Sequence, residues 1–71
     1  MIEKIGIIGG GQLGRMMVPP AKELGFQVKV VEGSEDCPAA QVGADVIVGG
    51  IKNEAAVEQL VTESDVTTWE I

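Results

Sequence analysis

A glycine-rich turn between an apolar run and a helical pattern constrains this chain more than any other feature. Gly9, Gly11 and Gly14 fit the spacing G-x-G-x-x-G, and they follow a short β-branched run at residues 4–8 (KIGII). Glycine permits a tight turn and a close approach to a ligand, and the N-terminus of the next helix presents N–H groups to an anion. The pattern predicts a strand–turn–helix unit that can bind an anion. The alternative is that these glycines only turn the strand into the helix.

The rest of the chain alternates predicted strands with predicted helices. Apolar side chains at helical spacing predict a helix over residues 12–24. The remaining predicted elements are strands at 26–32, 45–48 and 65–69, a short helix at 38–43 opened by Pro38, and a helix that follows the N-cap Asn53. This alternation implies a parallel sheet with right-handed crossovers. We therefore predict an α/β fold, a Rossmann-like half fold with a four-stranded parallel sheet of order 3-2-1-4, in one domain of residues 1–71.

Pro19 and Pro20 conflict with the first helical pattern. Proline lacks an N–H group, and in a helix interior it costs roughly 3 kcal/mol or more. We expect either a kink at this point or a helix that ends near Val18 and restarts with a proline in its new first turn. Met16 and Met17 are expected to be core residues of this helix.

Composition excludes several classes of function. The chain has 71 residues, with 5 Lys and Arg against 11 Asp and Glu, and its formal net charge is −6. An acidic chain whose only aromatic residues are Phe26 and Trp69 lacks the basic surface and the stacking platforms that bind nucleic acid. The absence of His and the single Cys37 exclude an internal disulfide and a His- or Cys-based zinc site. No apolar run approaches the ~18 residues of a membrane span. We therefore expect no nucleic-acid partner, no membrane and a cytoplasmic location.

The predicted strand order brings two distant segments together. In the order 3-2-1-4 the winding reverses between the first and fourth strands, and ligands bind outside the carboxyl ends of the strands at that switch point. The first strand ends at the glycine turn, and the fourth ends near Glu70. Gln12 and Leu13 are therefore expected to face the same crevice as Glu70. The glycine turn would hold an anion there, and Glu70 would accept hydrogen bonds from an amine or a hydroxyl. The alternative for Glu70 is a solvated acid.

Four segments of the sequence carry a resemblance to a known family. They are residues 9–16 (GGGQLGRM), 21–25 (AKELG), 38–42 (PAAQV) and 66–71 (VTTWEI). Together they resemble the opening loop, the end of the first helix, the loop after the second strand and the fourth strand of N5-carboxyaminoimidazole ribonucleotide synthases. This family, formerly called the ATPase subunit of phosphoribosylaminoimidazole carboxylase, belongs to the ATP-grasp superfamily. The resemblance covers about residues 5–71 and is far more specific than the three glycines alone.

The resemblance implies an enzyme of de novo purine biosynthesis. Such enzymes carboxylate 5-aminoimidazole ribonucleotide with bicarbonate and form ADP and phosphate through a carboxyphosphate intermediate. The chain would be the N-terminal preATP-grasp domain, and ATP and Mg²⁺ would be bound by ATP-grasp and C-terminal domains absent from these residues. Gly11, Gln12 and Leu13 would contact the ribonucleotide, and Glu70 would hydrogen-bond its amino or imidazole nitrogen. We expect no catalytic residue, metal ligand or bound cofactor in this chain, no turnover by it alone, and self-association through a surface that faces the other domains.

Two alternative functions stay open. Glu32 ends the second predicted strand, 18 residues after Gly14, about where dinucleotide-binding folds place an acid that binds a ribose hydroxyl. A nicotinamide-dinucleotide-binding module is therefore the second hypothesis, whereas the family resemblance makes Glu32 a strand-end residue. The third hypothesis is a non-catalytic folding or interaction unit. Arg15 is expected to be a surface arginine, with a phosphate contact as its alternative, and Cys37 a thiol without a chemical role.

Overall fold

Four parallel strands form the middle layer of the molecule. They are β1 (Lys4–Ile8), β2 (Gln27–Glu32), β3 (Asp45–Val48) and β4 (Val66–Trp69), in the order β3-β2-β1-β4. The computed structural model describes residues 3–9, 11–50 and 52–69, and of Leu13 the backbone only. The strand bounds lie within one residue of the predicted ranges, and the predicted strand order is confirmed. The reversal of winding therefore lies between β1 and β4.

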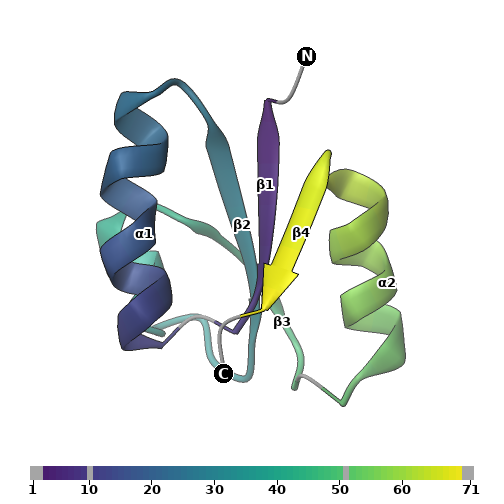
Figure 1. The fold of residues 1–71 in the computed structure, drawn as a ribbon. Helices are drawn as coiled ribbons and strands as arrows, with labels where there is room; N and C mark the ends of the chain where they lie inside the picture. The colour runs from purple at the N-terminus through teal and green to yellow at the C-terminus, as the bar shows by residue number, and fades with distance from the viewer. Residues whose placement is uncertain (1–2, 10, 51, 70–71) are drawn as a thin grey trace.

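One helix covers each face of the sheet (Figure 1). The helix α1 (Gln12–Glu23) connects β1 to β2 on one face, and α2 (Glu54–Glu63) connects β3 to β4 on the other. A short 3-10 helix, η1 (Ala40–Val42), stands where the sequence predicted a helix at 38–43. Right-handed crossovers on either side of the reversal require this placement of helices on opposite faces. No helix in the described residues has the length and apolar character needed to cross a membrane.

The apolar core has two halves, one on each face of the sheet. On the α1 face, Ile7 of β1 packs in a cluster with Val18 of the helix. On the α2 face, Ile8 packs in a second cluster with Leu60. Successive residues of a strand point to opposite faces, so neighbouring isoleucines serve different clusters. The central strands are consequently buried on both faces, as in other parallel sheets.

The helix α1 runs without interruption through Pro19 and Pro20, so the predicted end near Val18 is wrong. Both prolines are exposed, and so are Arg15 and Met16 one turn earlier. The carbonyl groups of Arg15 and Met16 lose their helical partners to proline, but on the solvent side of the helix water can replace the missing N–H groups. Val18 is fully buried against the sheet and holds the helix there. A kink at the prolines stays a prediction.

The buried stripe of α1 also differs from the predicted one. Met16 is 71% exposed and Leu24 is 76% exposed, so the assignment of Met16 to the core is wrong. Val18 contacts the sheet instead, with Met17 and Ala21 packed beside it. Met16 lies two residues before Val18, which places it about 200° away around the helix. Leu24 lies in the turn beyond the last helical residue.

Candidate functional site

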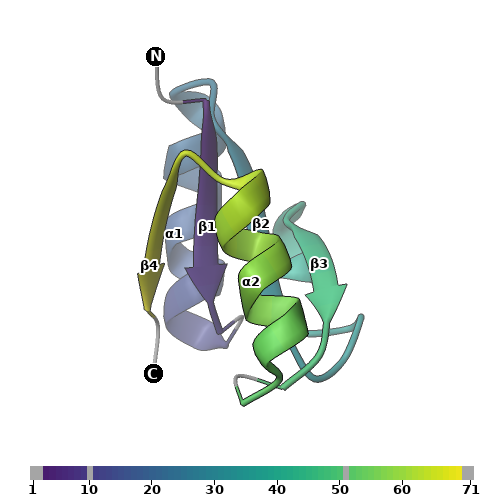
Figure 2. The ribbon, with the colours of Figure 1, turned by 90° about the vertical axis from the view of Figure 1, so that its right-hand side faces the viewer.

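The carboxyl ends of the strands gather at one edge of the sheet, where α1 also begins (Figures 1 and 2). In the parallel register, Ile8 at the end of β1 is paired with Trp69 of β4 on one side and with Val31 of β2 on the other. Gly9 follows Ile8 directly, so the glycine turn starts beside the end of β4. This edge between β1 and β4 is the switch point at which the sequence predicted a crevice.

Two glycines shape the turn between β1 and α1. Gly9 has a φ of 108°, in the left-handed region that disfavours any side chain, and its N–H group donates to the carbonyl of Val31 at 2.9 Å. Gly11 is the N-cap residue of α1 and accepts a hydrogen bond from the N–H group of Arg15 at 2.9 Å. Gly11 has no side chain with which to cap the helix, and the first turn of α1 contains no acidic residue. The first turn can therefore bind an anion through its N–H groups and the helix dipole.

The structure locates some of the predicted site residues and not others. Gly11 is half-buried in the turn, and Gln12 is the exposed first residue of α1. Leu13 lies in the first turn of α1, but its side chain lies outside the described part of the molecule. Glu70 lies outside the described residues, directly after the last residue of β4. The structure thus brings Gly11 and Gln12 to the end of β1, and the convergence of Leu13 and Glu70 on the crevice stays a prediction. Arg15 is exposed.

Glu32 lies at the same edge, and the backbone engages its carboxylate. The Oε1 atom of Glu32 accepts a hydrogen bond from the N–H group of Gly33 at 2.8 Å. The backbone carbonyl of Glu32 accepts another from Gly49 at 2.8 Å. These contacts agree with the strand-end role that the family resemblance implies for Glu32. The sequence placed Glu32 correctly at the end of β2. It did not predict that Gly33 and Gly49 donate hydrogen bonds to Glu32, and the only indication was that a glycine directly follows each of these strands.

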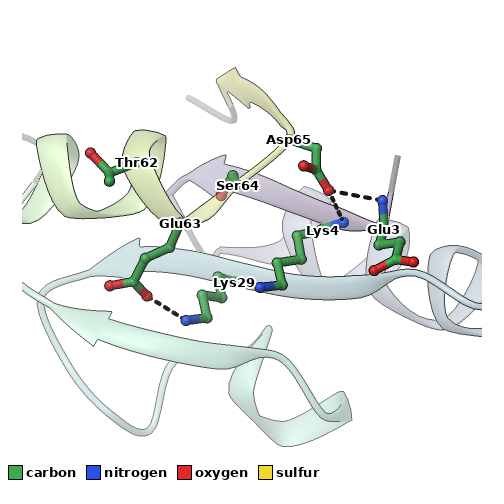
Figure 3. A pocket seen from close by; sticks show the side chains of 7 residues that line it. All are labelled: Glu3, Lys4, Lys29, Thr62, Glu63, Ser64 and Asp65. Carbon is green, nitrogen blue, oxygen red and sulfur yellow. Dashed lines mark hydrogen bonds and ion pairs between the residues drawn. The ribbon is translucent and has the colours of Figure 1, made fainter. Parts of the chain in front are cut away.

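A hollow of about 500 Å³ lies at the opposite, amino edge of the sheet (Figure 3). The Oδ2 atom of Asp65, just before β4, accepts hydrogen bonds from the backbone N–H groups of Glu3 and Lys4, both at 2.9 Å. These two bonds are the main cause that lowers the pKa of Asp65 below its ordinary value. The N–H group of Asp65 in turn donates to the carbonyl of Lys4 at 2.9 Å. This network fastens the start of β4 to the start of β1.

An ion pair closes the other side of the same hollow. Lys29 of β2 is paired with Glu63 at the end of α2, and this hydrogen bond is the main cause that lowers the pKa of Glu63. Both side chains point toward each other in Figure 3. Within the described residues, no three His, Cys, Asp or Glu side chains gather in a way that could hold a metal ion. The hollow lies where α2, β1 and β2 meet, and the ion pair and the Asp65 network fasten these elements around it.

Strand order, helix placement and a glycine turn at the switch point define the class of protein: a Rossmann-like α/β domain whose carboxyl edge carries the candidate site. The particular family follows from comparison with known proteins. The chain belongs to the ribonucleotide synthetase preATP-grasp domain family, which matches residues 2–71. The predicted family resemblance is confirmed.

Several relatives share this domain at high identity. The N5-carboxyaminoimidazole ribonucleotide synthase of Staphylococcus aureus strain COL is 47% identical over 66 residues, which cover 93% of this chain and 18% of the relative. The crystal structure of the synthetase from Thermotoga maritima superposes with a TM-score of 0.92 at 48% identity, covering 99% of this chain and 19% of the other. The synthase from Aspergillus clavatus, solved in complex with ATP, gives a TM-score of 0.88 at 43% identity, with coverage of 99% and 19%. The chain spans about a fifth of the length of these relatives.

Proposed function

We propose that the chain is the N-terminal, substrate-contributing domain of an ATP-dependent ligase of purine biosynthesis. The ligase carboxylates 5-aminoimidazole ribonucleotide with bicarbonate, and the products are N5-carboxyaminoimidazole ribonucleotide, ADP and phosphate. The observation that carries the proposal is the glycine turn at the switch point of the sheet. It occurs in a chain that is 47% identical to an N5-carboxyaminoimidazole ribonucleotide synthase. The charged, water-soluble substrates of this reaction suit a cytoplasmic enzyme.

The role of this domain in the reaction is to bind and orient the ribonucleotide. The glycine turn lets the substrate approach the backbone at Gly11, and the first-turn N–H groups of α1 suit an anionic group of the ribonucleotide. The exposed amide of Gln12 can both donate and accept hydrogen bonds at this position. Leu13 contacts the ribonucleotide through the same loop. Glu70 hydrogen-bonds the amino or imidazole nitrogen, and an acceptor bond from the amino group would orient the amine that is carboxylated.

We place the ATP and Mg²⁺ of the whole enzyme in its ATP-grasp and C-terminal domains. Related structures solved with ADP or ATP support nucleotide use by the whole enzyme. In the described residues, no three His, Cys, Asp or Glu side chains gather where they could hold a metal ion. We expect no carboxylation or ATP hydrolysis by residues 1–71 alone.

The partner that we propose for the exposed edge of β4 is the remainder of the same polypeptide. The strand β4 is an edge strand without a charged residue, and Val66 and Trp69 are 43% and 59% exposed. Uncharged edge strands pair readily with other chains unless they are covered. Residues 1–71 by themselves should therefore self-associate in a concentration-dependent way, which sedimentation measures.

The test is a chimera with a characterised relative. Residues 1–71 replace the matching segment of the S. aureus synthase, and the consumption of aminoimidazole ribonucleotide is measured with ATP and bicarbonate. We expect turnover, and we expect Gln12→Ala in the chimera to raise the KM for the ribonucleotide about tenfold at constant KM for ATP. Gln27→Ala is the matched control, because Gln27 is an exposed glutamine at the start of β2. A folded chimera without turnover, or turnover by residues 1–71 alone, contradicts the proposal.

The nicotinamide-binding alternative has its own outcome. Calorimetry of the chain with NAD and with the ribonucleotide separates the two hypotheses, because each predicts binding of only one ligand. Heat of binding with NAD alone would replace the proposed function by the dinucleotide module. Binding of neither ligand would favour the non-catalytic interaction unit.

A further inference from the structure

The end of β2 receives hydrogen bonds from the segments that follow three neighbouring strands. The N–H group of Gly9, just after β1, donates to the carbonyl of Val31 at 2.9 Å. The N–H group of Gly49, just after β3, donates to the carbonyl of Glu32 at 2.8 Å. The Oε1 atom of Glu32 accepts the third bond, from Gly33 just after β2, at 2.8 Å. The last two residues of β2 therefore accept hydrogen bonds from the residues that directly follow β1, β2 and β3.

Steric limits make two of these contacts specific to glycine. Gly9 has a φ of 108°, and a Cβ atom added to Gly49 would lie 2.7 Å from the Cβ atom of Ala56. Gly33 differs, because a Cβ atom there would meet nothing within 4 Å. Gly49 thus packs closely against the start of α2, and Gly9 adopts a backbone conformation that residues with a side chain rarely adopt. In contrast, the turn out of β2 is held by a side chain, that of Glu32.

We propose that Glu32 is a positioning residue for the ribonucleotide site. Its carboxylate fixes the turn at Gly33, and this keeps the carbonyls of Val31 and Glu32 in place as acceptors for the glycine turn and for the segment after β3. The bond from Gly33 needs an acceptor oxygen on the side chain, which a carboxylate and an amide both supply. This inference rests on the proposed function, since the site it serves is the glycine turn at Gly11.

The proposal gives an acid at this position a different task from the one that dinucleotide-binding folds assign to it. In those folds the acid at the end of the second strand hydrogen-bonds a ribose hydroxyl of the ligand. In this chain the carboxylate of Glu32 accepts a hydrogen bond from the backbone of the next residue. It therefore acts on the ligand indirectly, by ordering the turns that follow the strands. A turn that is already ordered loses less entropy when it binds a ligand, and loosening it lowers affinity.

Three substitutions separate positioning from direct contact. Glu32→Gln keeps an acceptor oxygen within reach of Gly33, Glu32→Ala removes it, and Glu32→Asp keeps the charge but withdraws it by one methylene group. Glu35→Ala is the matched control, because it removes an exposed acid from the loop that follows β2. The readouts are the ¹⁵N order parameters of Gly9, Gly11 and Gly33 and the Kd of 5-aminoimidazole ribonucleotide for the chain.

We expect Glu32→Ala and Glu32→Asp to lower the order parameters of these glycines and to raise the Kd about tenfold. Glu32→Gln and Glu35→Ala should stay within about twofold of the unmodified chain. Equal losses in Glu32→Gln and Glu32→Ala would overturn the proposal, because they would mean that the charge acts on the ligand itself. Unchanged order parameters and an unchanged Kd in Glu32→Ala would also overturn the proposal. If Glu32→Ala does not fold, the same two measurements on Glu32→Asp test the proposal instead. Failure of the unmodified chain to bind the ribonucleotide would count against the proposed function, while the order parameters would still judge the role of Glu32.

Discussion

The two edges of the sheet are fastened by different parts of the chain. At the amino edge, side chains make the contacts between segments. Asp65 accepts hydrogen bonds from the backbone N–H groups of Glu3 and Lys4, and Lys29 pairs with Glu63. At the carboxyl edge, the main contacts between neighbouring segments are backbone N–H groups of glycines bonded to the end of β2. Charged side chains thus line the amino edge, whereas glycines line the carboxyl edge. The comparison separates the side-chain contacts that fasten the strands at one end from the proposed binding site at the other.

The two helices at the carboxyl edge show a second contrast. Asn53 caps α2, since its Oδ1 atom accepts a hydrogen bond from the N–H group of Ala56 at 3.1 Å, and Glu54 complements the dipole in the first turn. The helix α1 begins instead at Gly11, without a side-chain cap or an acid. Side chains of the protein cap the start of α2, whereas the start of α1 suits an external anion.

The largest expected effect on stability comes from the amino half of β1. A Cβ atom on Gly6 would lie 2.4 Å from the Oγ atom of Ser64 and 3.0 Å from the Cγ atom of Leu60. Gly6→Val should therefore lower the free energy of unfolding by about 2 kcal/mol, as measured by chemical denaturation. Gly33→Ala, which adds a methyl group to open space, is the control and should change it by less than about 0.5 kcal/mol. An unchanged unfolding midpoint for Gly6→Val would show that this junction is loosely packed.

The next effect tests the capped helix. Asn53→Ala removes the acceptor for the N–H group of Ala56 and should cost about 1 kcal/mol of stability. The affinity for the ribonucleotide should not change, because α2 does not belong to the proposed site. Thermal unfolding and calorimetry measure the two quantities. A loss of affinity at constant stability would move the site toward α2.

Acid should weaken the amino edge. The folded-state pKa values of Asp65 and Glu63 lie below their ordinary values of 3.8 and 4.5, so both carboxylates stabilise the fold above those values. That contribution is lost as the pH falls through the lowered folded-state pKa values. The melting temperature should drop between about pH 5 and about pH 2, and Asp65→Asn should remove part of the drop. An identical pH profile for Asp65→Asn would show that the Asp65 network does not contribute.

The smallest effect on stability is expected at the uncapped helix. Gly11 has a φ of −77°, which any residue adopts, and Gly11→Ser supplies a capping hydroxyl. Stability should rise by a few tenths of a kcal/mol, since glycine is only slightly worse than serine as a cap. The ribonucleotide should bind at least about tenfold more weakly, because the new side chain fills the approach to the backbone. Unchanged affinity would separate the proposed site from this turn.

The sequence predicted those parts of the molecule that local patterns determine. The strands, their order, the cap at Asn53 and the glycine turn each follow from neighbouring residues or from the rules that connect parallel strands. The burial of Val18 and the exposure of Met16 depend on how α1 is rotated against the sheet, which its mixed apolar pattern left ambiguous. The continuity of α1 through the prolines depends on the same packing.

Contacts between distant residues were beyond reach of the sequence. The partners of Asp65 lie 61 and 62 residues away, and nothing near Asp65 in the sequence indicates them. The role of Glu32 likewise depends on segments that meet only after the sheet has formed. For the candidate site, the motif and the topology together predicted that Gly11 and Gln12 lie at the end of β1, and the structure shows them there. The ligand contacts of Gly11, Gln12, Leu13 and Glu70 are predictions that one experiment tests directly.

That test is an NMR titration of ¹⁵N-labelled residues 1–71 with 5-aminoimidazole ribonucleotide. The account predicts saturable amide shifts at Gly9, Gly11 and Gln12 and at the end of β4, including Glu70. The amides of Lys4 and Asp65 at the amino edge should not move. Shifts confined to the amino edge, or saturation without a change at the glycine turn, would contradict the assignment of binding to the carboxyl edge.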